Sequence, residues 1–388
     1  MERKEFIRST GRLAASAFFA QSKVFGFQAD TVRVGLIGTN GMGWSNLNAI
    51  LHIPGVECTA LCDVDENVLR NRVEELKKRQ INVKAYVDYK DLLKAKDVDV
   101  VIIATPDHWH CLQMVDAVAA GKDVYVEKPI GNSIHECEIM VAAAKKHKRV
   151  VQVGQWQRSQ QHFKDAMDFV HSGKLGKIRL VKAWAYQGWM KSVPVQPDAS
   201  VPAGVHYDKW LGPAPKRAFN PNRFHFNFRW YWDYAGGLMT DWGVHMLDYA
   251  LIGMKVSDPV SVMAAGGKFA YPEDAAETPD SLTTVYEFEG FNVQWEQATG
   301  IDLGPYQKNH GVAFIGNNGT LVVNREGWEV IPEKGRMDAV SFQRSQDNGL
   351  DKHMVNFVEA VRNKSAEGLN APIEAGAHIA IFSQMGNI

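Results

Sequence analysis

The 388-residue chain is longer than a single typical core requires and has room for two domains. Its composition is 45% hydrophobic and 22% charged, which is typical of a folded globular protein and excludes a mainly disordered chain. The net charge of −1 excludes the basic field that nucleic-acid and anionic-membrane partners need, and no run after residue 30 is long and apolar enough to span a bilayer.

The first 29 residues differ from the rest of the chain. Arg3, Lys4, Arg8 and Arg12 precede a short apolar stretch at residues 13–20. This order resembles a twin-arginine export signal, with Lys4 in place of the second arginine. We therefore expect a periplasmic protein whose residues 1–29 lie outside the fold; the alternative is a disordered arm on a cytoplasmic protein.

Residues 30–155 alternate between apolar runs and helical segments. Continuous apolar runs such as residues 32–38 are typical of strands that are buried on both faces. The predicted strands are 32–38, 56–62, 83–86, 98–104, 123–127 and 150–153, and the predicted helices are 41–50, 66–78, 89–94, 108–120 and 134–147. This alternation predicts an α/β Rossmann domain with a doubly wound parallel sheet.

The pattern changes in residues 156–388. Predicted strands are 177–186, 260–266, 281–289, 292–297, 312–315 and 320–324, and predicted helices are 159–171, 236–251 and 351–363. No helix is predicted between the last four strands, and turn signals at Glu289-Gly290 and Asn317-Asn318-Gly319 separate them. The second domain is therefore predicted to be α+β with a mostly antiparallel sheet, interrupted by a Pro- and aromatic-rich stretch at residues 190–234.

A glycine-rich turn lies between the first predicted strand and helix. Its sequence is Gly38-Thr39-Asn40-Gly41-Met42-Gly43, close to the G-x-G-x-x-G pattern but with Asn40 at the second position. Glycines let the backbone approach a pyrophosphate, whose oxygens accept hydrogen bonds from the helix N-terminus. We interpret it as a variant turn in which Asn40 tolerates a positive φ, and we predict dinucleotide contacts from Gly38, Asn40, Gly41, Met42 and Gly43.

Asp63 ends the second predicted strand, 25 residues after Gly38. A carboxylate at this position accepts hydrogen bonds from the ribose hydroxyls and repels a 2′-phosphate, which favours NAD over NADP. Arg70 and Arg72 on the next helix could soften this preference.

Three further motifs carry a family resemblance. They are Ala104-Thr105-Pro106, Glu127-Lys128-Pro129 and the segment GGLMTDWGVHMLD at residues 236–248. Together with the glycine-rich turn they resemble the Gfo/Idh/MocA family, which includes glucose–fructose oxidoreductase and inositol dehydrogenase. The resemblance implies a large open sheet in the second domain, NAD(P)-dependent oxidation or reduction of sugars, polyols or their relatives, and a homodimer or homotetramer formed through that sheet.

The same resemblance assigns roles by position. Lys128 matches the catalytic lysine, and Asp241 and His245 match a D-x-x-x-H pair. Further cofactor contacts are predicted from Thr105, Pro106, His110, Glu127, Lys128 and Gln155.

The residue types suit alcohol oxidation. A histidine can accept the hydroxyl proton, and a lysine beside the same oxygen stabilises developing negative charge. We expect Asp241, His245 and Asp248 on one helical face, with Asp241 orienting the substrate or the imidazole and Asp248 capping or pairing with His245. His108 and His110 belong to no complete ligand set, so no metal is predicted.

The aromatic stretch and nearby arginines suggest a carbohydrate site, because sugar C–H faces stack on aromatic rings; the alternative is packing in the core or at an interface. The predicted substrate contacts are Arg158, Trp189, Arg229 and Trp230. We predict a dehydrogenase that moves a hydride between NAD and a secondary hydroxyl of a sugar, polyol or glycoside. The alternatives are an NAD-dependent glycosidase or lyase that oxidises the sugar transiently, and a non-catalytic binding protein.

Overall fold

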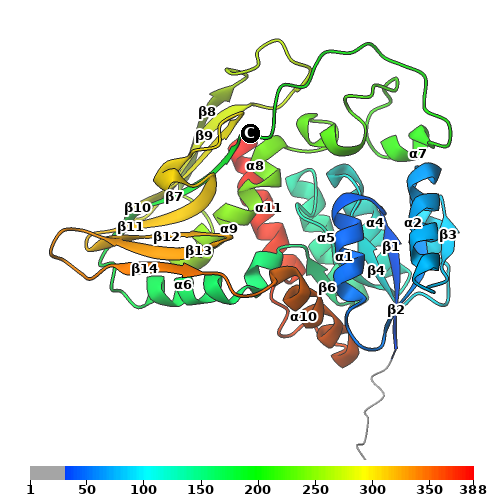
Figure 1. Ribbon diagram of the computed structural model, residues 1–388, viewed down its shortest axis with the longest axis horizontal. Helices are drawn as coiled ribbons and strands as arrows, with labels where there is room; N and C mark the ends of the chain where they lie inside the picture. The colour runs from blue at the N-terminus through cyan, green and yellow to red at the C-terminus, as the bar shows by residue number, and fades with distance from the viewer. Residues whose placement is uncertain (1–30) are drawn as a thin grey trace, which may run out of the picture.

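The computed structural model describes residues 31–388 and contains two β-sheets covered by helices (Figure 1). The predicted export signal lies outside the described residues. The first sheet has six parallel strands in the order β3-β2-β1-β4-β5-β6, as the alternating pattern predicts. Its strands are β1 (Val32–Ile37), β2 (Val56–Cys62), β3 (Lys84–Tyr86), β4 (Val100–Ile103), β5 (Asp123–Val126) and β6 (Val151–Val153).

Both faces of this sheet are buried, which explains its uninterrupted apolar strands. In β4, Val100 and Ile102 pack into the core on one face, and Val101 and Ile103 pack into the core on the other. The first face is covered by α1 (Gly41–Ile50), α2 (Glu66–Lys78) and α10 (Gly349–Asn363). The second face is covered by α3 (Tyr89–Leu93), α4 (Asp107–Ala119), α5 (Ile134–His147) and α11 (Ile373–Asn387).

The second sheet has eight strands in the order β14-β13-β12-β11-β7-β10-β9-β8. All neighbours are antiparallel except β10 and β7, which run parallel, so the prediction of a large, mostly antiparallel open sheet is confirmed. Its strands are β7 (Ile178–Gln187), β8 (Ser261–Gly267), β9 (Ser281–Phe288), β10 (Phe291–Thr299), β11 (His310–Gly316), β12 (Gly319–Asn324), β13 (Gly327–Pro332) and β14 (Val340–Arg344). One face packs on α6 (Gln161–His171), α8 (Gly237–Asp241), α9 (Gly243–Met254) and α11.

The structure corrects several sequence-based boundaries. Strands β13 and β14 and the helix α11 are absent from the prediction. The predicted helix at residues 236–251 is two helices, α8 (Gly237–Asp241) and α9 (Gly243–Met254), separated at Trp242. The break separates Asp241 from His245, so the two side chains do not share one continuous helical face.

Two helices from the end of the chain return to the first sheet. In α10, Met354 and Phe357 are buried against β1 and α1, and α11 packs on α5. Consequently α11 packs on both sheets, since Ala377 and Ala380 belong to the Rossmann core and Ile379 and Phe382 belong to the core of the second sheet.

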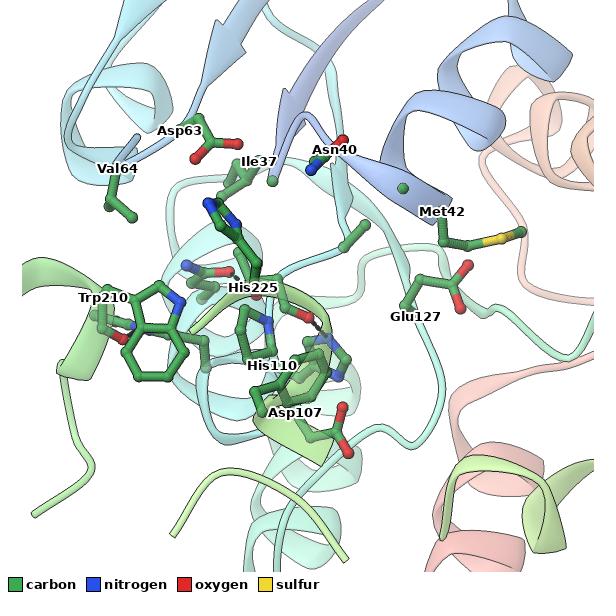
Figure 2. Close-up of a pocket in the computed structure, with 18 of the residues that line it drawn as sticks. Ile37, Asn40, Met42, Asp63, Val64, Asp107, His110, Glu127, Trp210 and His225 are labelled. Carbon is green, nitrogen blue, oxygen red and sulfur yellow. Dashed lines mark hydrogen bonds between the residues drawn. The ribbon is translucent and has the colours of Figure 1, made fainter. Parts of the chain in front are cut away.

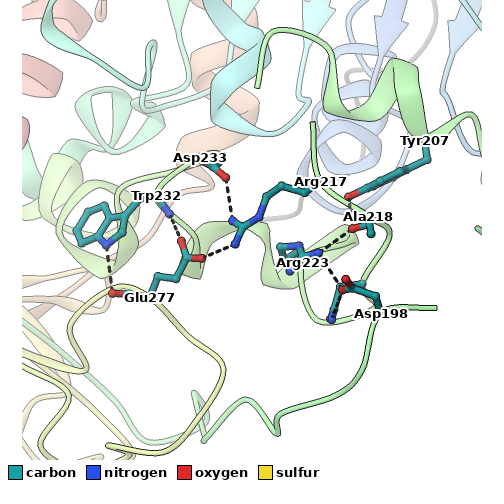
Figure 3. Close-up of polar contacts among 9 residues, drawn as sticks. Asp198, Tyr207, Arg217, Ala218, Arg223, Trp232, Asp233 and Glu277 are labelled. Atoms are coloured by element: carbon teal, nitrogen blue, oxygen red, sulfur yellow. Dashed lines mark hydrogen bonds and ion pairs between the residues drawn. The ribbon is translucent and has the colours of Figure 1, made fainter. Parts of the chain in front are cut away.

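Residues 190–234, which we call the strap, connect β7 to α8 and contain the short helices η2 (His225–Trp230) and α7 (Tyr207–Leu211). The strap passes over the Rossmann domain, with α7 beside α2 (Figure 1). Charged contacts hold it in shape: Arg217 pairs with Asp233 at 2.8 Å and with Glu277 at 3.0 Å (Figure 3).

Candidate active site

A cavity of about 930 Å³ lies between the carboxyl ends of the Rossmann strands and the second domain. Its walls come from the turns after β1, β2, β4 and β5, from the strap, and from Asp241, Trp242 and His245. Figure 2 labels residues from the Rossmann turns and from the strap. Ligands of doubly wound sheets bind at this end of the strands.

The glycine-rich turn fits a pyrophosphate. Gly38 has φ +86° and Gly41 has φ +46°, a region that favours glycine. A Cβ on Gly43 would lie 2.0 Å from the carbonyl oxygen of Gly38, so only glycine allows this close approach. Asn40 has an extended backbone with φ −103°, which corrects the prediction that it takes a positive φ. Its side chain does not cap α1, so the first N–H groups of the helix face the cavity without a capping side chain.

Asp63 follows β2 at the end of the cavity where the ribose of a dinucleotide would bind, which we call the ribose end (Figure 2). One carboxylate oxygen accepts hydrogen bonds from the backbone N–H and hydroxyl of Thr39, at 2.8 and 2.9 Å. Burial raises the pKa of this carboxyl, and the hydrogen bonds from Thr39 oppose the shift. The guanidinium of Arg72 lies 4.4 Å from the centre of the Trp44 ring and donates to the carbonyl of Thr39. Of Arg70 and Arg72, which the sequence places on the next helix, Arg72 therefore borders the glycine-rich turn, which we call the phosphate turn.

The turns after β4 and β5 form the next wall. Thr105, Pro106, His110, Glu127 and Lys128, for which the sequence predicts cofactor contacts, all line the cavity. The ring nitrogens of His110 lie 2.7 Å from the Pro129 carbonyl and 2.8 Å from that of Thr105, and burial lowers its pKa to about 4. The neutral imidazole has one N–H, so it donates to one of these carbonyls and packs against the other between the two turns.

Lys128 and Asp241 meet across the two domains. The ammonium of Lys128 donates to Asp241 Oδ1 at 2.7 Å and to its backbone carbonyl at 2.8 Å. Burial works to raise the pKa of Asp241, but Lys128 and Arg229 beside it hold the value at about 2. The carboxylate is therefore ionised at neutral pH and anchors the lysine.

His245 follows one turn later on α9 and also lines the cavity. Its Nδ1 is buried and has no hydrogen-bond partner among the described residues. Burial and then the cations Lys128 and Arg325 lower its pKa well below the ordinary value. The imidazole is accordingly neutral near pH 7, the state in which it can accept a proton.

Arg229 lies beside Asp241 rather than in open solvent. Its Nε is 3.4 Å from Asp241 Oδ2, and its guanidinium stacks over the rings of Phe226 and Phe228. It is the one predicted substrate residue that lines the cavity.

The other predicted residues do not line the cavity. Arg158 pairs with Asp248 at 2.5 Å, so Asp248 neither caps a helix nor pairs with His245 as predicted. Trp230 is buried in the core of the strap, and Trp189 is 55% exposed. Gln155 is buried and donates to the backbone carbonyl of Val244, and Gly43 is packed behind the phosphate turn.

Several cavity residues escaped the sequence analysis, among them Asp107, Arg325 and Trp156. Asp107 follows Pro106 at the carboxyl end of β4, a position that could have indicated it. Its side chain is buried, which raises its pKa to about 8 against the opposing effect of Lys128. Arg325 and Trp156 come from a hairpin turn and from η1 (Trp156–Ser159), and no motif distinguishes them in the sequence.

The strap closes over the ribose end of the cavity. The backbone N–H of His206 donates to the Val64 carbonyl at 2.9 Å, and His225 lies 3.0 Å from the Asp65 carboxylate. Figure 2 shows Trp210 and His225 from the strap opposite Asp63 and Val64. The strap thus covers the cavity beside the turn after β2.

A Rossmann sheet, a glycine phosphate turn and a lysine–carboxylate–histidine set define an NAD-binding oxidoreductase. Two family models agree: residues 32–155 match "Oxidoreductase family, NAD-binding Rossmann fold", and residues 180–387 match "Oxidoreductase family, C-terminal alpha/beta domain". The chain belongs to the Gfo/Idh/MocA oxidoreductase family, and its cofactor is NAD.

Similar curated proteins carry a different name. A glycosyl hydrolase family 109 protein of Shewanella baltica is 35% identical over 122 residues, which cover 30% of this chain and 27% of that protein. An alpha-N-acetylgalactosaminidase of Shewanella oneidensis is 34% identical over the same length and the same shares. The matched part therefore spans only about a quarter of these relatives.

Solved structures share the fold over most of the chain. A levoglucosan dehydrogenase in complex with NADH has a TM-score of 0.69 at 18% identity, covering 92% of this chain and 96% of that one. The aldose-aldose oxidoreductase of Caulobacter crescentus has a TM-score of 0.67 at 20% identity, with the same coverage. The myo-inositol 2-dehydrogenase of Lactobacillus plantarum has a TM-score of 0.67 at 18% identity and covers 92% and 98%. None of the helices in residues 31–388 has the length and apolarity to cross a membrane.

Proposed function

We propose that the protein is a dehydrogenase that moves a hydride between NAD and a secondary hydroxyl of a sugar, polyol or glycoside. The observation that carries the proposal is the meeting of Lys128, Asp241 and His245 at the end of the cavity beyond the phosphate turn. Lys128 comes from the Rossmann domain, and Asp241 and His245 come from the second domain. Charged side chains are rarely removed from water unless they pair, and Lys128 and Asp241 do pair here.

Each side chain has a role in the proposed reaction. Bound NAD would supply the hydride acceptor, and the protein's residues would manage the proton and the geometry. Neutral His245, which lines the cavity, accepts the hydroxyl proton. Lys128 donates a hydrogen bond to the same oxygen, and Asp241 holds the ammonium in place.

We also propose a preference for NAD over NADP. The carboxylate of Asp63 lies at the ribose end and would repel a 2′-phosphate. Arg72 is engaged by Trp44 and by Glu75 at 2.8 Å, which leaves it less available to bind a phosphate there.

The test is the appearance of NADH when sugars and polyols are added to the enzyme with NAD. Replacing Lys128 by Met should lower kcat by about 10²-fold, the usual cost of removing one donor to a developing oxyanion. Lys146 is exposed, and Lys146→Met is the matched control. Normal turnover in Lys128→Met would contradict the proposed role.

A second candidate is an NAD-dependent glycosidase or lyase, which begins with the same oxidation. It is favoured by the similarity to the glycosyl hydrolase family 109 proteins and by the strap, whose contacts across the ribose end would slow exchange of the cofactor. It predicts cleavage of a glycoside with NAD in catalytic amount and no net NADH. Measuring NADH and released sugar in one reaction distinguishes the two candidates.

Two further proposals concern the surroundings of the enzyme. Exposed apolar residues around the second sheet, including Val260, Met263 and Phe269, suit a homodimer or homotetramer contact there, which light scattering would test. The basic and apolar order of residues 1–29 supports export to the periplasm, which cell fractionation would test.

A further inference from the structure

Arg325 is a charged residue of the cavity to which the proposed reaction gives no role. It lies in the turn between β12 and β13 and lines the cavity together with His245 and Trp242. The turn is a hairpin of the second sheet, where an arginine side chain would ordinarily extend into solvent. Here it points instead toward the reacting groups.

The guanidinium of Arg325 has aromatic neighbours but no carboxylate partner. The central carbon of the guanidinium, Cζ, lies 4.4 Å from the centre of the Trp242 ring and 4.9 Å from the centre of the Trp156 ring. No carboxylate of the described residues is within ion-pair distance, and the buried Nε has no hydrogen-bond partner. Its one side-chain hydrogen bond is a long contact of 3.4 Å to Gln157 Oε1.

Such a group is costly to bury. Desolvation of an unpaired charge is expensive unless a partner compensates it, and burial lowers the pKa of this guanidinium to about 10. The two indoles contact the guanidinium over their rings, so its edge N–H groups remain for a planar acceptor. A carboxylate accepts two parallel hydrogen bonds from that edge.

The other charges of the cavity do not supply this acceptor. Asp241 is already shared by Lys128 at 2.7 Å and Arg229 at 3.4 Å. Asp107 is buried with a pKa of about 8, so it is largely neutral at pH 7. Glu127 accepts hydrogen bonds from Asn46 at 2.8 Å and from the backbone N–H of Lys128 at 3.2 Å, so it is not available to Arg325 either. Lys128 and Arg229 both pair with Asp241, whereas Arg325 has no carboxylate within ion-pair distance among the described residues, which favours an anionic ligand there.

We propose that the substrate is a sugar acid and that Arg325 binds its carboxylate, with Trp156 and Trp242 beside it. This rests on the proposed function, because it names the substrate class of the same site. Arg325 would thus select substrates by charge while Lys128 and His245 act on the hydroxyl. A sugar phosphate could also meet the guanidinium, so it is a separate arm of the test.

The experiment compares hexuronates and aldonates with their neutral parent sugars and polyols and with the corresponding sugar phosphates. For each pair we measure kcat/KM by NADH formation and, independently, ligand affinity by tryptophan fluorescence, since Trp156 and Trp242 border the site. We expect the carboxylates to be preferred over the neutral parents by about tenfold or more, since a hydrogen bond to a charged group contributes about 1.5–3 kcal/mol.

Variants assign the preference to one residue. Arg325→Met should abolish the preference for each acid over its neutral parent. Arg325→Lys should retain part of this preference, because lysine keeps the charge but lacks the paired N–H groups of the guanidinium. Arg344→Met removes an exposed arginine on β14 and should leave the preference unchanged. Circular dichroism would show that each variant is folded.

Three results would overturn the inference. NADH formation with equal preference for acids and neutral sugars refutes it while the proposed function stands. A charge preference that persists in Arg325→Met refutes the assignment to Arg325, and stronger selection of phosphates refutes the substrate class. If no ligand yields NADH, the proposed function fails, and the fluorescence affinities alone decide whether the site selects sugar acids.

Discussion

Lys128 and Asp241, 113 residues apart in the sequence, form an ion pair of 2.7 Å that joins the Rossmann domain to the second domain inside the cavity. The pair is largely removed from water, with 16% and 15% of the two side chains exposed. It thus links the position of the proposed catalytic lysine to the packing of the two domains.

Replacing Asp241 by Asn tests this link. The amide keeps the shape but loses the charge that holds Lys128 and Arg229, so we expect kcat to fall roughly 10²-fold. Affinity for NAD, measured by NADH fluorescence titration, should change little because Asp241 lies beyond the phosphate turn. A variant with normal kcat would show that Lys128 needs no anchor.

His245 makes a prediction about pH. Burial and two nearby cations lower its pKa, so the neutral imidazole persists well below its ordinary titration range as the pH falls. The acidic limb of kcat should therefore lie below the ordinary histidine pKa of about 6.5, and His245→Gln should lower kcat by about 10²-fold or more. Exposed His135→Gln is the control. A limb near pH 6.5 that disappears in His245→Gln would contradict the buried neutral state.

Asp107 should make the protein less stable as the pH rises. Its pKa is raised to about 8 in the folded state, so between its unfolded value and pH 8 the folded protein binds the extra proton. The free energy of unfolding of the wild type should then fall relative to Asp107→Asn across that window. Since one pKa unit corresponds to about 1.4 kcal/mol, we expect the variant to gain at least about 1 kcal/mol between pH 5.5 and 8.5.

Urea unfolding of the protein without added NAD, at both pH values, measures this difference. Asp91→Asn alters an exposed carboxylate and serves as the control. An equal effect of Asp107→Asn at both pH values would exclude a raised pKa for this carboxyl.

Asp63 should control the choice between NAD and NADP. Asp63→Asn keeps an oxygen that can accept from Thr39 but removes the charge that repels a 2′-phosphate. We expect the ratio of the Kd for NADP to the Kd for NAD to fall by about tenfold, which is about 1.4 kcal/mol. Isothermal titration with both cofactors measures it. Tighter binding of NADP by the wild type would refute the proposed preference.

Arg158 and Asp248 are expected to stabilise the fold rather than bind substrate. They form two hydrogen bonds of 2.5 and 2.7 Å, and Asp248 is 3% exposed. Arg158→Met leaves a buried carboxylate without its partner, so the free energy of unfolding should fall by about 3–5 kcal/mol. The double variant Arg158→Met/Asp248→Leu should recover part of this loss. If Arg158→Met raises KM without altering stability, Arg158 belongs to the substrate site after all.

The Rossmann domain could be predicted almost completely because its signals are local. Both faces of a parallel sheet are buried, so β1 and β4 are visible as continuous apolar runs, and the phosphate turn is one short segment. The edge strand β14 was missed because it is mostly exposed and lacks an apolar pattern. The helix α11 is absent from the prediction because its own buried residues lie on several of its faces. Its sequence therefore does not show the apolar repeat of a helix with one buried face.

By itself, the sequence determined the domain types, the phosphate turn and three residues that do gather in the cavity, Lys128, Asp241 and His245. Only the tertiary structure decided which charges meet. It directs Arg158 to Asp248, brings Arg325 from a hairpin turn to Trp242, and buries Asp107. The physical reason is that burial and ion pairing depend on the distances between segments far apart in the chain, and a single sequence does not contain those distances.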